Sequence, residues 1–373
     1  MFNYEKNIHP YEGLKMSTVF EWDPNNSQVY TKDYGTGSII LSSTQSDSFD
    51  KLGGANFTMN AESETLTLQN DSDNIPIYWP EFNRNNDGTM TDSGKGLDIN
   101  VSAGTLLVDY RLNDQNHTVD RSHTVAYLGC SESANFILKN SGSLSIKNPG
   151  TVFMFIDYVV SNKPPKLIMS GNSEFEIKQT TKIEDDVPAF IFLASEISLS
   201  ESSKLTFESS NLYLGDGNFN YCNISIQDKS TVTLINNGIM QKNDIEKNKT
   251  WFKLKAGSPL LNLESFDGIN FPLYLDNVEY PEGLFNFITT EGKNEGKIMI
   301  EFSQQNPNNI KDNINKIFDK KLIAINNKII KKEKHEDYFN IGYKPDQLKN
   351  DHKFMIITIS LKDQYQSYQK VNV

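Results

Sequence analysis

The chain has 373 residues, of which 37% are hydrophobic and 23% are charged, and its formal net charge is −12. An acidic chain repels nucleic acid and anionic membrane surfaces, so we expect neither as a partner. We also expect no integral membrane segment, because no run of about 20 apolar residues occurs. The first residues lack the apolar core of a secretory signal, which leaves the export route open.

Residues 1–35 are rich in aromatic side chains and predict a cap over one end of a β-rich body. The aromatic residues that suggest this cap are Tyr4, Tyr11, Phe20, Trp22, Tyr30 and Tyr34. A stack of strands needs such a cover because a terminal strand exposes unpaired backbone groups and an apolar interior.

Short strands with alternating apolar and polar residues recur between residues 36 and 300. The clearest repeat has its first apolar positions at Leu144, Phe175, Leu205 and Val232, which are 31, 30 and 27 residues apart. Two further strand-like segments follow each of the first three. Three strands per repeat of about thirty residues predict a right-handed parallel β-helix, a β-solenoid in which each strand pairs with its counterpart one coil away. A β-sandwich of short strands is the alternative fold.

Upstream, the same alternation continues less regularly. We expect strands in residues 38–41, 55–59, 65–68, 97–101, 105–109 and 135–138. Two polar excursions, residues 69–96 and 113–121, interrupt the pattern.

Residues 301–373 change character and predict a small α+β end-piece. Apolar residues at helical spacing predict a helix within residues 307–320, and Asn326-Asn327 between two short strands is a hairpin signal. This part holds 13 Lys and 9 Asp or Glu, a net charge of +4, so the first 300 residues carry −16. Its basic stretch, residues 320–334, is either a contact patch or a solvated face.

The strand spacing, with steps such as Ser143-Leu144-Ser145-Ile146, resembles the passenger regions of bacterial autotransporter adhesins and, more loosely, β-helix proteins of the pectate-lyase type. The resemblance covers residues 36–300. It implies a secreted protein or one on the surface of a bacterial cell. No motif of a pectin-active enzyme occurs in the sequence.

One polar segment gathers residues that could perform chemistry on acidic sugars. Arg111, His117, Asp120, Arg121 and His123 combine cations that would hold a carboxylate with groups that could act as a base. The alternative is a polar loop between coils that ion pairs hold in place. Adjacent Asp185 and Asp186 are not expected to act as a catalytic pair, because neighbouring strand residues point to opposite faces.

Two other segments suggest ligands. Tyr78 and Trp79, together with Trp22 and Trp251, offer aromatic rings of the kind that stack on sugars, or that pack a loop against the body. Asn83, Asn85 and Asp87 place oxygen ligands at alternate positions, as in the first half of a calcium loop, although a plain turn fits the same residues.

The isolated cysteines Cys130 and Cys222 fit no metal-ligand spacing, and whether they form a disulfide stays open, as does the redox compartment.

The sequence favours a non-enzymatic, adhesin-like β-solenoid that binds glycans, a host surface or another copy of itself. A β-helix polysaccharide lyase or hydrolase is the second hypothesis, with residues 109–123 in its cleft. A structural component such as a phage fibre is the third. We expect no cofactor.

Overall fold

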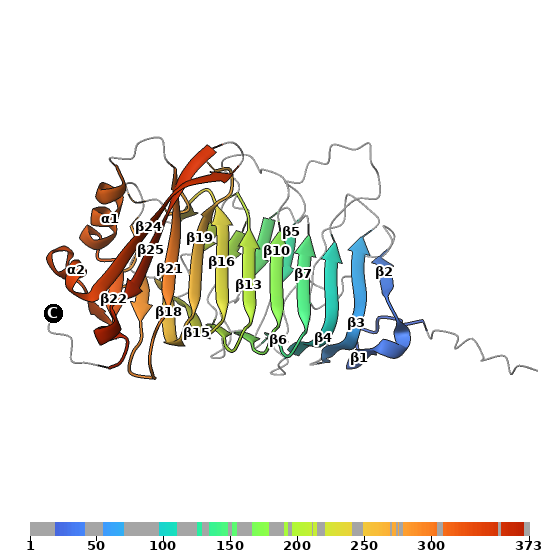
Figure 1. Ribbon diagram of the computed structural model, residues 1–373. Coiled ribbons are helices and arrows are strands. Elements are labelled where there is room, and N and C mark those ends of the chain that lie inside the picture. Colours follow the sequence, from blue (N-terminus) through green and yellow to red (C-terminus); the bar gives the residue numbers. More distant parts are fainter. Residues whose placement is uncertain are drawn as a thin grey trace, which may run out of the picture.

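The computed structural model describes residues 19–41, 55–70, 97–109, 125–128, 134–147, 151–154, 166–178, 190–192, 196–210, 212–214, 221–240, 249–268, 271–273, 275, 279–303, 309–349 and 352–368. They form an elongated all-β body built on a long, mostly parallel sheet, with its N-terminal strands at one end and its two helices at the other (Figure 1). No described helix is long and apolar enough to cross a membrane.

Two parallel stacks of strands run along the body and share its two longest strands, β3 (Phe57–Asn70) and β4 (Leu97–Asp109). Stack A contains the N-terminal halves of β3 and β4 and β1 (Gln28–Thr31), β6 (Ala134–Leu138), β9 (Lys166–Met169), β12 (Glu196–Leu199), β15 (Tyr221–Asp228), β18 (Lys249–Gly257), β20 (Phe285–Phe287) and β22 (Ile323–Ile325). Stack B contains the C-terminal halves of β3 and β4. Its other members are β2 (Gly37–Leu41), β7 (Ser143–Lys147), β10 (Glu174–Lys178), β13 (Lys204–Glu208), β16 (Thr231–Asn236), β19 (Leu260–Ser265) and β21 (Lys297–Ser303).

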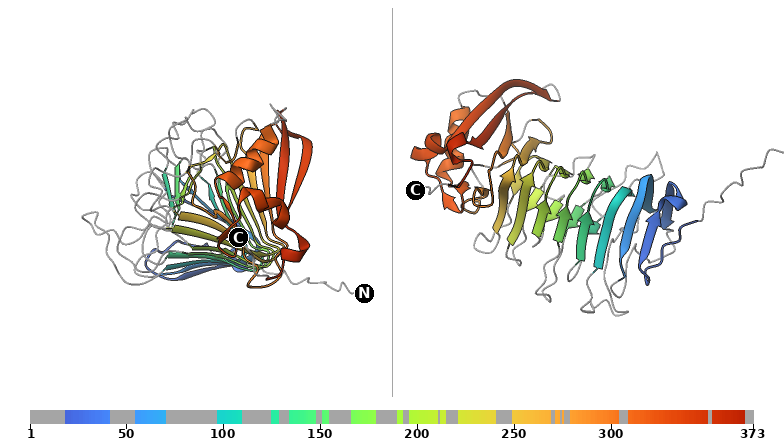
Figure 2. Two further views of the ribbon diagram at one scale, coloured as in Figure 1. Left: turned by 90° about the vertical axis from the view of Figure 1, so that its left-hand side faces the viewer. Right: turned by 60° about the horizontal axis from the view of Figure 1, so that its bottom comes forward.

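A separate five-stranded sheet forms stack C, and its described strands also pair in parallel. The members of stack C are β5 (Val125–Leu128), β8 (Thr151–Met154), β11 (Phe190–Phe192), β14 (Leu212–Leu214) and β17 (Ile239–Met240). The long sheet does not close on itself. Seen along the body, the stacks lie on different sides of a common interior (Figure 2).

The predicted register of the central repeat is confirmed. Leu144 pairs with Phe175, Phe175 with Leu205, and Leu205 with Val232, all in parallel strands. The parallel pairing excludes the β-sandwich, whose sheets are antiparallel. The structure differs from the prediction in β3 and β4, because in each of them one continuous strand replaces two expected segments. The pairing of β3 with β4 shifts its register at the corner.

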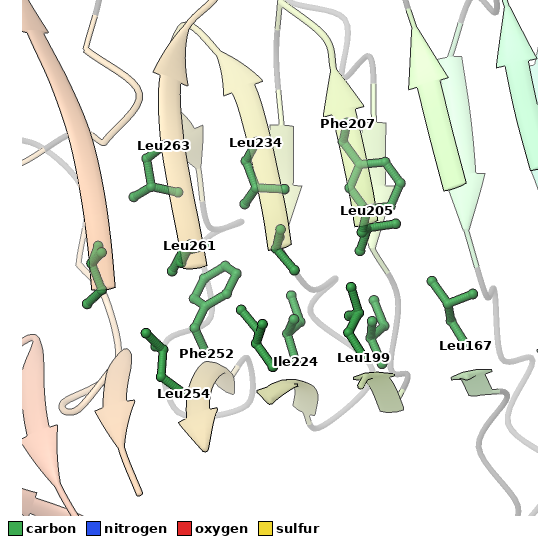
Figure 3. Packing of buried hydrophobic residues seen from close by; sticks show 14 of the residues in the cluster. Leu167, Leu199, Leu205, Phe207, Ile224, Leu234, Phe252, Leu254, Leu261 and Leu263 are labelled. Atoms are coloured by element: carbon green, nitrogen blue, oxygen red, sulfur yellow. The ribbon is translucent and has the colours of Figure 1, made fainter. Parts of the chain in front are cut away.

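The interior is a narrow apolar layer to which stacks A and B each contribute alternate side chains. Leu167, Ile224 and Phe252 of stack A face Leu205 and Leu261 of stack B (Figure 3). Each of these side chains is at most 1% exposed. Because the side chains of a strand alternate between its faces, two inward residues per short strand supply this core, which suits a chain with few hydrophobic residues.

The corners between stacks A and B are tight and repeat from strand to strand. One residue in each corner has a left-handed backbone, and these residues include Asn140, Gly171, Glu201, Asp228 and Gly257, with φ between 53° and 99°. The carbonyl of Gly171 accepts a hydrogen bond from the N–H of Ser202, and that of Glu201 accepts one from Lys229. The corners are therefore hydrogen-bonded to one another along the body.

Aromatic rings gather over the N-terminal end of the stacks. The Phe20 ring lies 5.1 Å from the rings of Tyr30 and Tyr34, and the Trp22 ring lies 4.9 Å from that of Phe57. Tyr4 and Tyr11 of the predicted cap lie outside the described residues.

The C-terminal part ends the parallel pairing. β21 pairs in parallel with β19 but antiparallel with β25 (His352–Leu361), which in turn pairs antiparallel with β24 (Phe339–Lys349). The predicted hairpin is confirmed, since β22 pairs antiparallel with β23 (Lys328–Ile329).

The predicted helix is also confirmed, as α1 (Asn309–Asp319), which buries Ile314, Ile317 and Phe318. A second, four-residue helix is α2 (His335–Tyr338). Three 3-10 turns complete the described elements: η1 (Lys32–Tyr34), η3 (Lys332–Lys334) and η4 (Asp363–Tyr365). The division of the chain at residues 35 and 300 stays a prediction.

Candidate functional site

The site residues predicted from the sequence lie outside the described residues, so their predicted roles stay predictions. They are Tyr78, Trp79, Asn83, Asn85, Asp87, Arg111, His117, Asp120, Arg121 and His123. Cys130 also lies outside them, whereas Cys222 is in β15. Within the described ranges, no three His, Cys, Asp or Glu side chains come together as a metal site would require.

The described residues form a partly open pocket of about 490 Å³ on the outer face of stack A, near the C-terminal end of the body. This volume falls within the range of about 300–1,000 Å³ typical of small-molecule sites. Its described lining residues are Asn223, Trp251, Lys253, Glu282, Gly283, Asn286, Ala324, Asn327 and Ile329.

The strand register explains why these residues meet. Asn223 of β15 is paired with Trp251 of β18, and Lys253 of β18 is paired with Asn286 of β20. Their neighbours Ile224 and Phe252 are fully buried. Since side chains alternate between the two faces of a strand, Asn223 and Trp251 are directed outward.

An aromatic ring and two small residues help to shape the pocket. The indole N–H of Trp251 donates a hydrogen bond to the carbonyl oxygen of Glu282 (3.3 Å), which orients the ring. Gly283 and Ala324 are the smallest residues of the described lining. A Cβ atom at Gly283 would lie only 3.2 Å from the Cβ of Ala324 and 3.3 Å from the Cδ1 of Ile329. Gly283 also has φ of 69°, which disfavours any larger residue.

A pair of amides forms the polar side of the pocket. The Nδ2 of Asn286 donates to the Oδ1 of Asn327 (2.6 Å), and the backbone N–H of Asn327 donates to the Oδ1 of Asn286 (3.2 Å). Asn327 occupies the turn between β22 and β23 with φ of 65°, a conformation that Asn tolerates well. The hairpin therefore holds both amides in place, and the Nδ2 of Asn327 makes no hydrogen bond to a described residue.

The described pocket lining contains one acidic side chain, Glu282, and one basic side chain, Lys253, and they differ in whether they form an ion pair. The Glu282 carboxylate forms an ion pair with Lys321 (2.7 Å). No ion pair joins Lys253 to an acidic side chain in the part of the chain that the structure describes. On the same strand, Lys255 is bound to Glu291 (3.1 Å).

A second hollow, of about 340 Å³, follows α1 and is lined by charged and amide side chains. Its described lining includes no aromatic or aliphatic wall, and Lys332 there is already paired with Asp319 (2.7 Å). We therefore regard the pocket on stack A as the candidate site.

The sequence indicated only part of this site. Trp251 was named among the aromatic residues suited to sugars, and Asn327 was named as a turn residue. Asn223, Lys253, Glu282 and Asn286 were missed. The signal that could have found Asn223 is its position one repeat before Trp251, at the same outward place in the strand pattern.

A comparison with family models, curated proteins and solved structures finds no match for this chain.

Proposed function

We propose that the chain is a non-enzymatic β-solenoid that binds a glycan in the pocket walled by Trp251. The observation that carries this proposal is the combination of one oriented indole ring, amide side chains and two small residues in the lining of a single hollow. Sugar rings present an apolar face that packs against an aromatic ring, and hydroxyl groups that pair with amides. Asn223 and Asn327 supply such amides in the lining, and the buried Asn286 holds the side chain of Asn327 in place.

We also propose that the chain winds as a β-helix through the three stacks of strands. One strand of stack C lies between successive strands of stacks B and A in the sequence, as in β10, β11 and β12. This order supports a parallel β-helix with three strands per coil. We propose the right-handed form, since parallel strands of one sheet are connected right-handed in about 98% of cases.

The charges of the pocket favour binding over sugar hydrolysis. Hydrolysis of a glycosidic bond usually requires two carboxyl groups that face each other across the bond. Among the described lining residues, Glu282 is the one carboxylate, and it is paired with Lys321. An adhesin-like role on a bacterial surface or outside the cell belongs to the same proposal, because glycans are displayed there.

Binding of oligosaccharides to the purified full-length chain tests this function. We expect Trp251→Ala to weaken the binding of a responsive oligosaccharide about tenfold, since it removes a ring contact worth about 0.5–1.5 kcal/mol together with buried apolar area. Trp251→Phe should retain most of the affinity, because the ring face remains. Isothermal calorimetry against a panel of neutral and charged oligosaccharides provides the measurement.

Tyr343→Ala is the matched control, because Tyr343 of β24 is an exposed aromatic residue, at 50%, that does not line the pocket. Its affinities should equal those of the unmodified chain. Failure of the whole panel to bind, or equal binding by the Trp251→Ala variant, would contradict the proposed function.

A further inference from the structure

We infer that the pocket on stack A selects an anionic sugar, with Lys253 as the residue that recognises the negative charge. This inference rests on the proposed glycan binding and names the chemical class of the ligand. It is carried by the ion-pair pattern around the pocket rather than by its shape.

Lys253, Lys255 and Lys321 differ in their ion-pair partners. Lys321 is bound to Glu282 and Lys255 is bound to Glu291, at 2.7 Å and 3.1 Å. Lys253 lines the pocket, and none of the described acidic side chains pairs with it. Its ammonium group is therefore the one described cation of the lining that remains available to a ligand.

The position of Lys253 suits a ligand that also packs on Trp251. The two residues are separated by one residue on β18, so both side chains leave the same face of the strand. Lys253 and Asn286 are opposite each other in the parallel register of β18 and β20. The side-chain amide of Asn286 is hydrogen-bonded to that of Asn327. A sugar ring on the indole would thus bring its acidic substituent towards an ammonium group flanked by amide donors.

The net charge of the chain does not oppose this selection at the pocket. Asn327 and Ile329 of the lining belong to the C-terminal 73 residues, where Lys outnumbers Asp and Glu by 13 to 9. In solution at physiological salt, charges farther away than about 8 Å are largely screened. The acidic charge of the distant body is therefore largely screened at the pocket.

The test compares one oligosaccharide in its charged and neutral forms. A uronic acid oligomer and its methyl ester have the same ring, so they differ at the carboxylate. We expect the unmodified chain to bind the acid about tenfold more tightly than the ester, since one hydrogen-bonded charge has about that effect on a binding constant. Added salt should reduce this preference.

Variants of the two lysines on β18 complete the test. Lys253→Gln should bind the acid and the ester equally, at the affinity that the unmodified chain has for the ester. Lys255→Gln is the matched control. It removes the same charge from a residue that lies two positions after Lys253 on β18 and does not line the pocket. This variant should keep the preference for the acid. A sulfated oligomer of the same length shows whether sulfate can replace the carboxylate as the source of charge.

The outcomes separate the inference from the proposed function. Equal affinity of the unmodified chain for the acid and the ester, or an undiminished preference in Lys253→Gln, would overturn the inference while glycan binding stands. Absence of binding to both forms and to the neutral panel would overturn the two together.

Discussion

The corner residues show how single positions adapt to the repeated turn between stacks A and B. Gly171 has φ of 71°, and a Cβ atom there would lie 2.7 Å from backbone atoms of Asn140. In the next corner Glu201 adopts the same conformation with a full side chain, and its carboxylate accepts a hydrogen bond from the N–H of Gly171. The N–H of Glu201 in turn donates to the carboxylate of Asp228 (2.9 Å). Acidic corner residues thus offset left-handed strain by binding the backbone of the neighbouring corner.

We expect Gly171→Ala to lower the free energy of unfolding by more than about 1 kcal/mol, because the substitution combines an unfavourable φ with a backbone clash. Urea unfolding followed by circular dichroism would measure the loss. Asn140→Gly is the matched control in the preceding corner. It should change stability by less than about 0.5 kcal/mol, since relief of strain is offset by a more flexible unfolded chain. Equal stability of Gly171→Ala and the unmodified chain would show that the corner can relax.

At the scale of strands, inward and outward positions have different energetic roles. Inward residues are almost completely buried, whereas ion pairs on the outer face, such as Glu174–Lys204 (2.8 Å) and Lys166–Glu196 (2.8 Å), join side chains that are about half exposed. Exposed ion pairs contribute about 0–1 kcal/mol each. The stability of the stacks therefore comes mainly from the apolar layer.

Leu205 and Thr206 of β13 provide a direct comparison of the two faces. We expect Leu205→Ala to lower the free energy of unfolding by about 2–5 kcal/mol, since it leaves a cavity in a layer with little room to collapse. Thr206→Ala, one residue along on the outer face, should cost less than about 1 kcal/mol. Similar losses in both variants, measured by urea unfolding, would contradict the assignment of the inward face.

The register of the central strands could be predicted from the sequence because an error of one residue would turn every apolar side chain outward. Leu144, Phe175 and Leu205 therefore carry a strong signal. The sequence signal for the pocket is weak. Two of its lining residues, Gly283 and Ala324, carry no functional group, and the others come from strands that are separated in the sequence. Only the parallel register brings Lys253 beside Asn286.

At the scale of the molecule, the structure is a body with two different ends. Aromatic rings around Trp22 and Phe57 lie at the N-terminal end, and α1 with the antiparallel strands β24 and β25 lies at the other (Figure 1). Between them, each strand contacts mainly its neighbours one repeat away, as in other stacked repeats.

Small-angle scattering would test this elongated shape in solution. A compact chain of this length would have a radius of gyration of about 21 Å. We expect a clearly larger value for the monomer. A value at or below that of a compact chain would contradict the extended arrangement of the stacks, and size-exclusion chromatography with light scattering would verify that one copy is measured.

The location of the pocket close to one end of the body has a mechanical consequence. A glycan held between Trp251 and the Asn326-Asn327 turn would anchor the molecule by its C-terminal region. The rest of the body would then extend away from the attachment point, and the rings around Trp22 would lie at its far end.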